Sequence, residues 1–449
     1  MLACSRTALL ALGLLAGCAG HSAHTEEARR ALDRRDPKSA LASLNKELEV
    51  SSGKELPKKV SGDNALFLLD RSTVLQSLQD YTNSSRDLET ADKQVEMLDF
   101  ERSTSHEIGR YLFSDDVGPY KARPFEKLFV NTINMINYLT LGNLSGAKIE
   151  ARRFAVMQKY LSQVDKDDPT VKLLGPGSYF AGFAFEKTND FDEAIHYYDE
   201  ALSCAPWTTL DEPVRRLSQY AGYQSPRLTK IVKAGKAEEI DPDSGELLVI
   251  VAYGRVPALI ANRVPIGLAL TAAGMYLDPV QVQSARRMAG QGLVTWVNYP
   301  VLEPAKRSYA NPSISVDGKT SDLDTITLVD ELMRAAYKKG EGAIMASAIV
   351  RMIARGAVGA GVGVAAGKGS NSGPLGMLLA LGTQAALAAA DTPDTRSWAT
   401  LPARIAISRV RVPAGKHTVS IRAQGVSREQ QVEVAKGGFA VVNLTELSQ

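Results

Sequence analysis

The chain has 449 residues, of which 45% are hydrophobic and 23% are charged, a balance typical of a globular protein with two or three domains. Its net charge of +2 creates no general electrostatic field for nucleic acid or anionic lipid, so we expect no nucleic-acid partner. Two of the three cysteines lie in the first 18 residues. Cys204 therefore cannot form an internal disulfide, and the fold must depend on packing.

Residues 1–17 have the pattern of a secretory signal peptide, because a basic n-region precedes an apolar run, 8–16, that is too short to span a bilayer. The run ends in a sequence that resembles the lipobox of bacterial lipoproteins: Leu15, Ala16, Gly17 and Cys18. The resemblance implies cleavage before Cys18, acylation of this residue with fatty acids such as palmitate, and a tether over residues 18–24. By analogy with lipoprotein sorting in enteric bacteria, Ala19 in place of an aspartate favours the outer membrane, facing the periplasm, over the inner membrane.

Residues 25–225 show helical periodicity broken by polar turns, which predicts a series of helical hairpins. The clearest unit, 175–208, resembles a tetratricopeptide repeat. This resemblance implies a helical solenoid with one groove that binds extended peptides or other helices. A small residue follows each turn at irregular intervals: Ala40, Ser84, Ala147 and Ala194. The residues expected to form the repeat scaffold are Tyr138, Ala147, Gly182, Phe185, Ala194, Tyr198 and Pro206.

Two adjacent arginines in the predicted hairpin 125–160 are candidates for partner binding. Arg152 and Arg153 follow Glu150, and arginine side chains bind carboxylates well. In the groove they could contact an acidic peptide or the carboxylates of a glycan. The same pattern fits an exposed helical face with no partner, and both interpretations stay open.

The composition changes after a basic linker expected at 226–244. Short, branched segments bounded by turn residues are typical of β-strands, and they predict a β-rich domain from 245–322 and 400–449. Their spacing favours an antiparallel sheet or sandwich. We expect strands near 246–253, 264–268, 293–297, 313–316, 403–410, 417–422, 429–434 and 439–444. The fold class is therefore α+β, with an N-terminal α-solenoid and a C-terminal sandwich-like domain.

A helical insertion rich in glycine and alanine is expected between the two β segments, over 323–399. It has a first helix near 328–336 and two apolar stretches, 343–366 and 375–390. Internal arginines in the first stretch and the short length of the second argue against membrane-spanning helices. A hairpin buried against the sheet is the preferred interpretation. Partial membrane insertion, or cover by a partner, is the alternative.

No motif in the chain predicts catalysis. The run GAGVGVAAGKGS has Val362 and Gly369 where a phosphate-binding loop needs glycine and a hydroxyl. The five histidines have no metal-ligand spacing, and no nucleophile elbow occurs. We therefore expect no enzyme activity, no metal and no cofactor. A hydrolase within the C-terminal region remains an alternative.

Several segments together resemble a group of uncharacterised bacterial envelope lipoproteins with tetratricopeptide-like N-terminal halves. These are the lipobox, NYLTLGNLSGAKIEARRFAV, YGRVP and RSWATLPARI. The resemblance implies a lipid-anchored adaptor that binds envelope proteins, and it brings no catalytic residue. Such proteins are associated with regulators of cell-wall synthesis, so binding to peptidoglycan is an alternative. Trp296 and Trp398 are candidate groups for stacking on a glycan.

Overall fold

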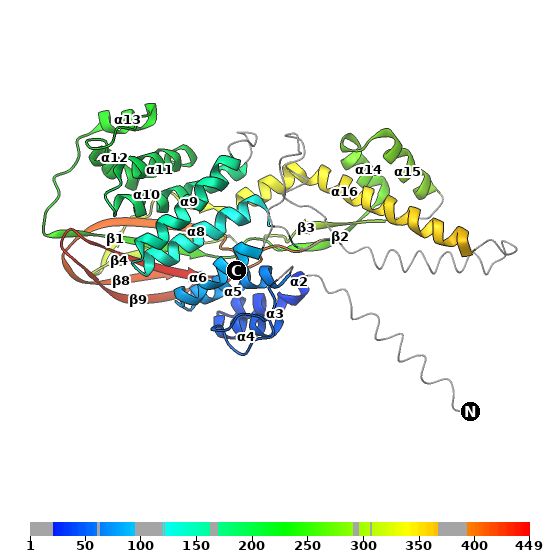
Figure 1. Ribbon diagram of the computed structural model, residues 1–449, viewed down its shortest axis with the longest axis horizontal. Coiled ribbons are helices and arrows are strands. Elements are labelled where there is room, and N and C mark those ends of the chain that lie inside the picture. Colours follow the sequence, from blue (N-terminus) through cyan, green and yellow to red (C-terminus); the bar gives the residue numbers. More distant parts are fainter. Residues whose placement is uncertain are drawn as a thin grey trace.

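The computed structural model describes residues 21–60, 63–94, 120, 122–161, 169–290, 296–305, 308–366 and 393–449. It confirms the α+β class. Helical hairpins lie along the sheets at one end of the long axis, and a smaller helical unit extends toward the other end (Figure 1). The lipobox and the apolar stretch 375–390 lie outside the described residues.

Four antiparallel hairpins make the helical layer, as the sequence predicts. The first two are α3 (Glu26–Asp33) with α4 (Pro37–Glu47), and α5 (Asp63–Ser77) with α6 (Tyr81–Gln94). The next two are α8 (Pro124–Thr140) with α9 (Leu144–Leu161), and α10 (Leu174–Glu186) with α11 (Phe191–Cys204). A short helix, α2 (His21–His24), precedes them, and η2 (Pro169–Leu173) leads into the last hairpin.

All four hairpin turns share one local structure. Two or three residues after the end of its first helix, each turn has a residue with left-handed backbone, namely Arg35 (φ 60°), Gln79 (φ 63°), Gly142 (φ 69°) or Asn189 (φ 59°). The next residue is an aspartate or asparagine, and its N–H donates to the carbonyl five residues earlier, at 2.8–3.0 Å. This bond closes the helix end, as in a Schellman motif. In the first three turns the same side chain also caps the following helix, by accepting from the N–H of Ser39, Asn83 or Gly146.

Two four-stranded sheets stack as a sandwich. The first is mixed and has the order β10-β1-β7-β6, and the second has the order β5-β4-β8-β9. Strands of the first sheet are β1 (Ser244–Tyr253), β6 (Thr327–Leu328), β7 (Arg404–Pro413) and β10 (Phe439–Glu446). Strands of the second are β4 (Ser313–Val316), β5 (Lys319–Ser321), β8 (Gly415–Ala423) and β9 (Val426–Val434). The expected sandwich is confirmed, although one pairing is not antiparallel: β1 and β10 pair in parallel, with Val249 opposite Val442.

Strand β1 is buried on both faces and joins the layers. Leu247, Val249 and Val251 pack in the core between the two sheets. Leu248 and Ile250 point the other way, into the core shared with the helices. This two-sided burial explains why the strand is a continuous apolar run without the alternation of a half-exposed strand. The result is three layers: helices, mixed sheet and second sheet.

The remaining elements correct several predicted boundaries. The predicted strand at 264–268 is wrong beyond Pro265, because β2 (Leu259–Pro265) is followed by helix α14 (Ile266–Ala273). Its partner, β3 (Trp296–Leu302), begins near the end of the predicted strand 293–297. Other elements in this part are η4 (Gly274–Tyr276), α15 (Pro279–Gly290) and α16 (Val329–Ala366). Helix α16 runs without a break through the boundary predicted between its two parts.

The predicted linker at 226–244 is also partly helical. After η3 (Thr208–Leu210) and α12 (Asp211–Leu217), helix α13 (Pro226–Ala234) follows. Its start is well specified, because Ser225 accepts a hydrogen bond from the N–H of Leu228 at 3.2 Å and Pro226 occupies the first turn. Only residues 235–243 connect it to β1 without a helix or strand.

Candidate functional site

Most of the residues that match the repeat pattern form the interior of the helical layer. Ala147 and Ala194 have no exposed area, and Phe185 stacks on Tyr197 with ring centroids 5.5 Å apart. A Cβ on Gly182 would lie 2.5 Å from the Tyr198 ring, so only glycine allows α10 to approach α11 this closely. Of the other two scaffold residues, Tyr138 donates a hydrogen bond to Glu89, and the Pro206 carbonyl accepts one from Thr325. The five buried residues hold the repeat together, whereas Tyr138 is half-buried and Pro206 is exposed.

Helices of the second, third and fourth hairpins contact strand β10 of the mixed sheet. Phe183 of α10 packs edge-on against Phe439 of β10, with ring centroids 5.5 Å apart. The Tyr81 hydroxyl donates to the carbonyl of Asn443, and Gln76 accepts from Thr445. This face of the repeats, which we call the inner face, is therefore covered by the protein's own sheet and is not open as a groove.

A buried ionic cluster fastens this contact. Arg409 of β7 donates to both carboxylate oxygens of Glu186 in α10, at 2.9 and 2.8 Å. It also donates to Glu246 of β1, through Nε at 2.6 Å and Nη2 at 3.0 Å. The Tyr198 hydroxyl accepts from Arg409 and donates to Glu186. Lys187 contacts both glutamates from the edge of the cluster.

Electrostatics keep the cluster ionised despite its burial. Burial disfavours the charged carboxylates, but Arg409 and Lys187 outweigh it and hold the pKa of Glu186 and of Glu246 below the ordinary value. Burial also disfavours the Arg409 cation, yet the two glutamates raise its pKa well above the usual range. Every charge has a partner of opposite sign. This arrangement suits a structural junction better than acid and base chemistry, which needs a group that can exchange a proton near neutral pH.

Sequence patterns could have pointed to this cluster, although we identified none of its ionic members as functional. Glu246 is the acidic residue at the start of an otherwise apolar strand, and Arg409 lies within the branched run AISRVRV. A charge inside a buried strand indicates a buried partner. The identity of that partner, Glu186, depends on how the layers stack.

The N-terminal residues 21–24 do not act as a tether, which corrects part of the predicted segment 18–24. They form α2, and the buried His21 places Nε2 2.9 Å from Asp70 Oδ2. Asp70 also accepts from the N–H and the hydroxyl of Thr400, at 2.9 and 2.8 Å. Only Ala19 and Gly20 separate Cys18 from this packed helix.

The exposed side of the repeats carries the two predicted arginines. Arg152 and Arg153 lie on α9, the second helix of its hairpin, with exposed side chains. Ile149 and Val156 flank them and are 49% and 69% exposed. Spacings of three, four and seven residues place all four on one face of the helix. Arg153 pairs with Glu150 at 2.9 Å, whereas Arg152 has no ion pair within the described part of the chain. We call these four residues the α9 stripe.

The two tryptophans proposed for glycan stacking differ in exposure. Trp398 is 1% exposed, and its backbone N–H donates to Glu126, so its role as a stacking group is wrong. Trp296 is 50% exposed. Within the described ranges, His, Cys, Asp and Glu side chains do not gather in threes as a metal site would require. None of the described helices is long and apolar enough to cross a bilayer.

Comparison with known proteins adds no assignment to this geometry. No protein-family model matches the chain, and no curated protein sequence matches it.

Proposed function

We propose that this protein is a lipid-anchored adaptor of the bacterial envelope that binds an acidic partner protein through the α9 stripe and performs no catalysis itself. Acylated Cys18 would hold it at the outer membrane, facing the periplasm. The observation that carries the proposal is the exposed stripe itself. It combines two aliphatic side chains with two arginines on a rigid helix, whereas the inner face of the repeats is covered.

The composition of the stripe defines the partner's chemistry. Arginine and aliphatic side chains together suit an amphipathic segment that presents carboxylates beside apolar residues. The hairpin core fixes the backbone of α9, because Phe154 and Ala151 are fully buried beneath it. The α9 backbone would therefore lose little conformational entropy when a partner binds. Peptidoglycan remains a weaker candidate, because the burial of Trp398 removes one of its two proposed stacking groups.

Reversal of the charge on the stripe tests the proposal. Pull-down from envelope extracts with the wild type should capture a defined partner, and Arg152→Glu with Arg153→Glu should lower capture at least about tenfold, through like-charge repulsion. The matched control is Lys230→Glu with Lys233→Glu, an exposed pair of basic residues on α13, which should leave capture unchanged. A photo-crosslinker at position 156 should label the same partner. Equal capture by the two double variants would refute the proposal.

The anchor is tested separately. Cys18→Ala should move the exported protein from the membrane fraction to the soluble periplasmic fraction, because no acyl chain could then be attached. Fractionation of the envelope followed by immunoblotting measures the change. If Cys18→Ala stays on the outer membrane in the same amount as the wild type, acylation of Cys18 is not what anchors the protein there.

A further inference from the structure

Exposed apolar side chains concentrate in one small part of the molecule, residues 259–290 and 296–302, which we call the distal unit. The described chain has eleven large apolar side chains that are exposed, and five lie here: Leu268, Met275, Tyr276, Val280 and Trp296. Leu268, Met275 and Val280 are 62%, 85% and 72% exposed. In Figure 1, α14 and α15 lie at the far end of the long axis from α11–α13. Such a concentration of exposed apolar side chains is typical of a binding surface.

The distal unit is also locally basic, although the whole chain is close to neutral. It contains three arginines, Arg263, Arg286 and Arg287, and a single acidic residue, Asp278. Asp278 is engaged as a cap of α15, where it accepts from the N–H of Gln281 at 2.8 Å. Arg286 and Arg287 are exposed, and neither has an ion pair within the described part of the chain. The net field of this surface attracts anions.

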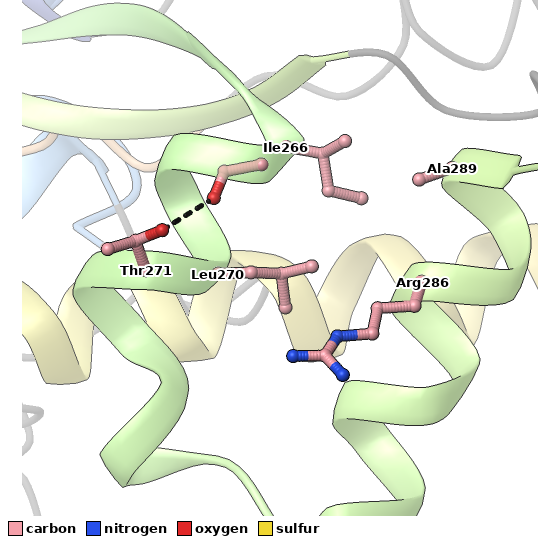
Figure 2. A pocket seen from close by; sticks show the side chains of 6 residues that line it. Ile266, Leu270, Thr271, Arg286 and Ala289 are labelled. Carbon is pink, nitrogen blue, oxygen red and sulfur yellow. Dashed lines mark hydrogen bonds between the residues drawn. The ribbon is translucent and has the colours of Figure 1, made fainter.

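A cavity of about 350 Å³ opens between α14 and α15, beside these arginines. Ile266 and Leu270 line it from α14, and Ala289 lines it from α15. Figure 2 shows the Arg286 side chain extending from α15 toward Leu270, across the space between the helices. Thr271 does not add a free donor, because its hydroxyl donates to the carbonyl of Gly267 at 3.0 Å. The site therefore combines an apolar hollow with one unpaired cation, which fits an anionic head group joined to an apolar chain.

We propose that the distal unit is a second membrane-contact site, which docks onto the surface of a bilayer that contains anionic phospholipid. Arg286 and Arg287 bind the phosphate groups, and Leu268, Met275 and Val280 insert among the upper parts of the acyl chains. Trp296 and Tyr276 match the aromatic residues that occupy the interface between membrane and water. Charge complementarity and the exposed aromatic pair favour a lipid surface over a protein. The site acts without the acyl anchor and without the α9 stripe.

Vesicle flotation with the full chain carrying Cys18→Ala tests this site without the anchor. The protein should float with vesicles of phosphatidylglycerol and phosphatidylcholine, but not with phosphatidylcholine alone, and added salt should weaken its binding. Arg286→Gln with Arg287→Gln should lower binding about tenfold or more, since each basic residue near an anionic surface contributes about 1 kcal/mol. Circular dichroism and the thermal midpoint check that this surface variant is folded.

Two triple variants distinguish specific membrane binding by the distal unit from non-specific adsorption of exposed apolar side chains. Leu268→Ser, Met275→Ser and Val280→Ser together should abolish flotation. Leu141→Ser, Tyr220→Ser and Val232→Ser, at exposed apolar positions outside the distal unit and the α9 stripe, should preserve it. Tryptophan fluorescence gives a second readout, because Trp207 and Trp398 are buried and Trp296 is exposed. Brominated lipid should quench Trp296 in the wild type and not in the Arg286→Gln, Arg287→Gln variant.

The proposal is overturned if the Cys18→Ala protein does not float with anionic vesicles, or if the distal variants float as well as that protein. It is also overturned if the distal variants lose protein capture while the Cys18→Ala protein binds no vesicles, because the distal unit would then be a protein-binding surface. Failure here is distinguishable from failure of the adaptor proposal. Variants of the α9 stripe change protein capture only, and variants of the distal unit change vesicle binding only.

Discussion

Arg409 is the residue on which the junction between helices and sheet depends. It contacts Glu186 from the repeats and Glu246 from the neighbouring strand, and its guanidinium lies 5.0 Å from the Phe183 ring centroid. A buried ion group contributes little net stability compared with apolar packing, but removal of one member leaves uncompensated charge. The cluster therefore determines how the layers are oriented more than how tightly they bind.

Arg409→Met should destabilise the protein by about 3 to 5 kcal/mol at neutral pH, because two buried carboxylates lose their main counter-charge. Urea unfolding followed by circular dichroism measures the change. Arg30→Met is the matched control, since Arg30 makes an ion pair with Glu26 in which both side chains are exposed, and it should change stability by less than about 1 kcal/mol.

The penalty of Arg409→Met should depend on pH in a defined direction. In the wild type the pKa values of Glu186 and Glu246 are lowered, so their stabilising effect is present above the ordinary glutamate pKa and is lost as pH falls toward the lowered values. In the variant the carboxyls can protonate more easily. The difference between the two proteins should shrink in acid, and a difference independent of pH would contradict this account.

At the scale of elements, the hairpins are the part of the fold that local sequence specifies best. Each turn pairs a left-handed residue with a following Asp or Asn, and a small residue four positions later is fully buried. These signals act over a few residues and are visible in the sequence. The short apolar run at 264–268 was ambiguous, because such runs fit a strand or a buried helix equally well. In the structure it divides between β2 and α14.

Gly182 offers a direct test of how closely two helices pack. Gly182→Ala should destabilise the protein by about 1 to 3 kcal/mol, because the added Cβ meets the Tyr198 ring, which Glu186 and Arg409 hold in place. Gly267→Ala is the control, since a Cβ there meets no atom within 4 Å. That substitution should be neutral or slightly stabilising. Thermal unfolding compares the two, and equal effects would show that the approach of α10 to α11 is not tight.

At the scale of the whole molecule, helices and sheets share one hydrophobic core. Residues from β1, β7 and β10 belong to the same buried cluster as residues from every hairpin. The division predicted at 226–244 is therefore a boundary in sequence and not in packing. Segment 393–403, which precedes β7, also joins the two parts of the chain, since Thr395 contacts Ser22 and Thr400 contacts both Thr73 and Asp70.

Cleavage of the connection between α13 and β1 tests this union. A protease site inserted between the exposed residues Glu238 and Glu239 should yield two fragments that co-elute in size-exclusion chromatography, because burial of the shared core holds them together. They should separate in urea. Dissociation in native buffer would show that the two halves are independent domains.

Local sequence determined the hairpins, most of the strands and the α+β class, because turn bonds and apolar periodicity act between residues that are close in the chain. The location of the exposed surfaces was decided only by tertiary structure. Strands β1 and β10 pair although nearly two hundred residues separate them, and their sheet covers the inner face of the repeats. That contact leaves Arg152 and Arg153 on the exposed side. Residues 21–24, predicted as part of a tether, instead form α2 and pack against Asp70. Such outcomes depend on which apolar faces meet, and no local pattern specifies the partner of a buried face.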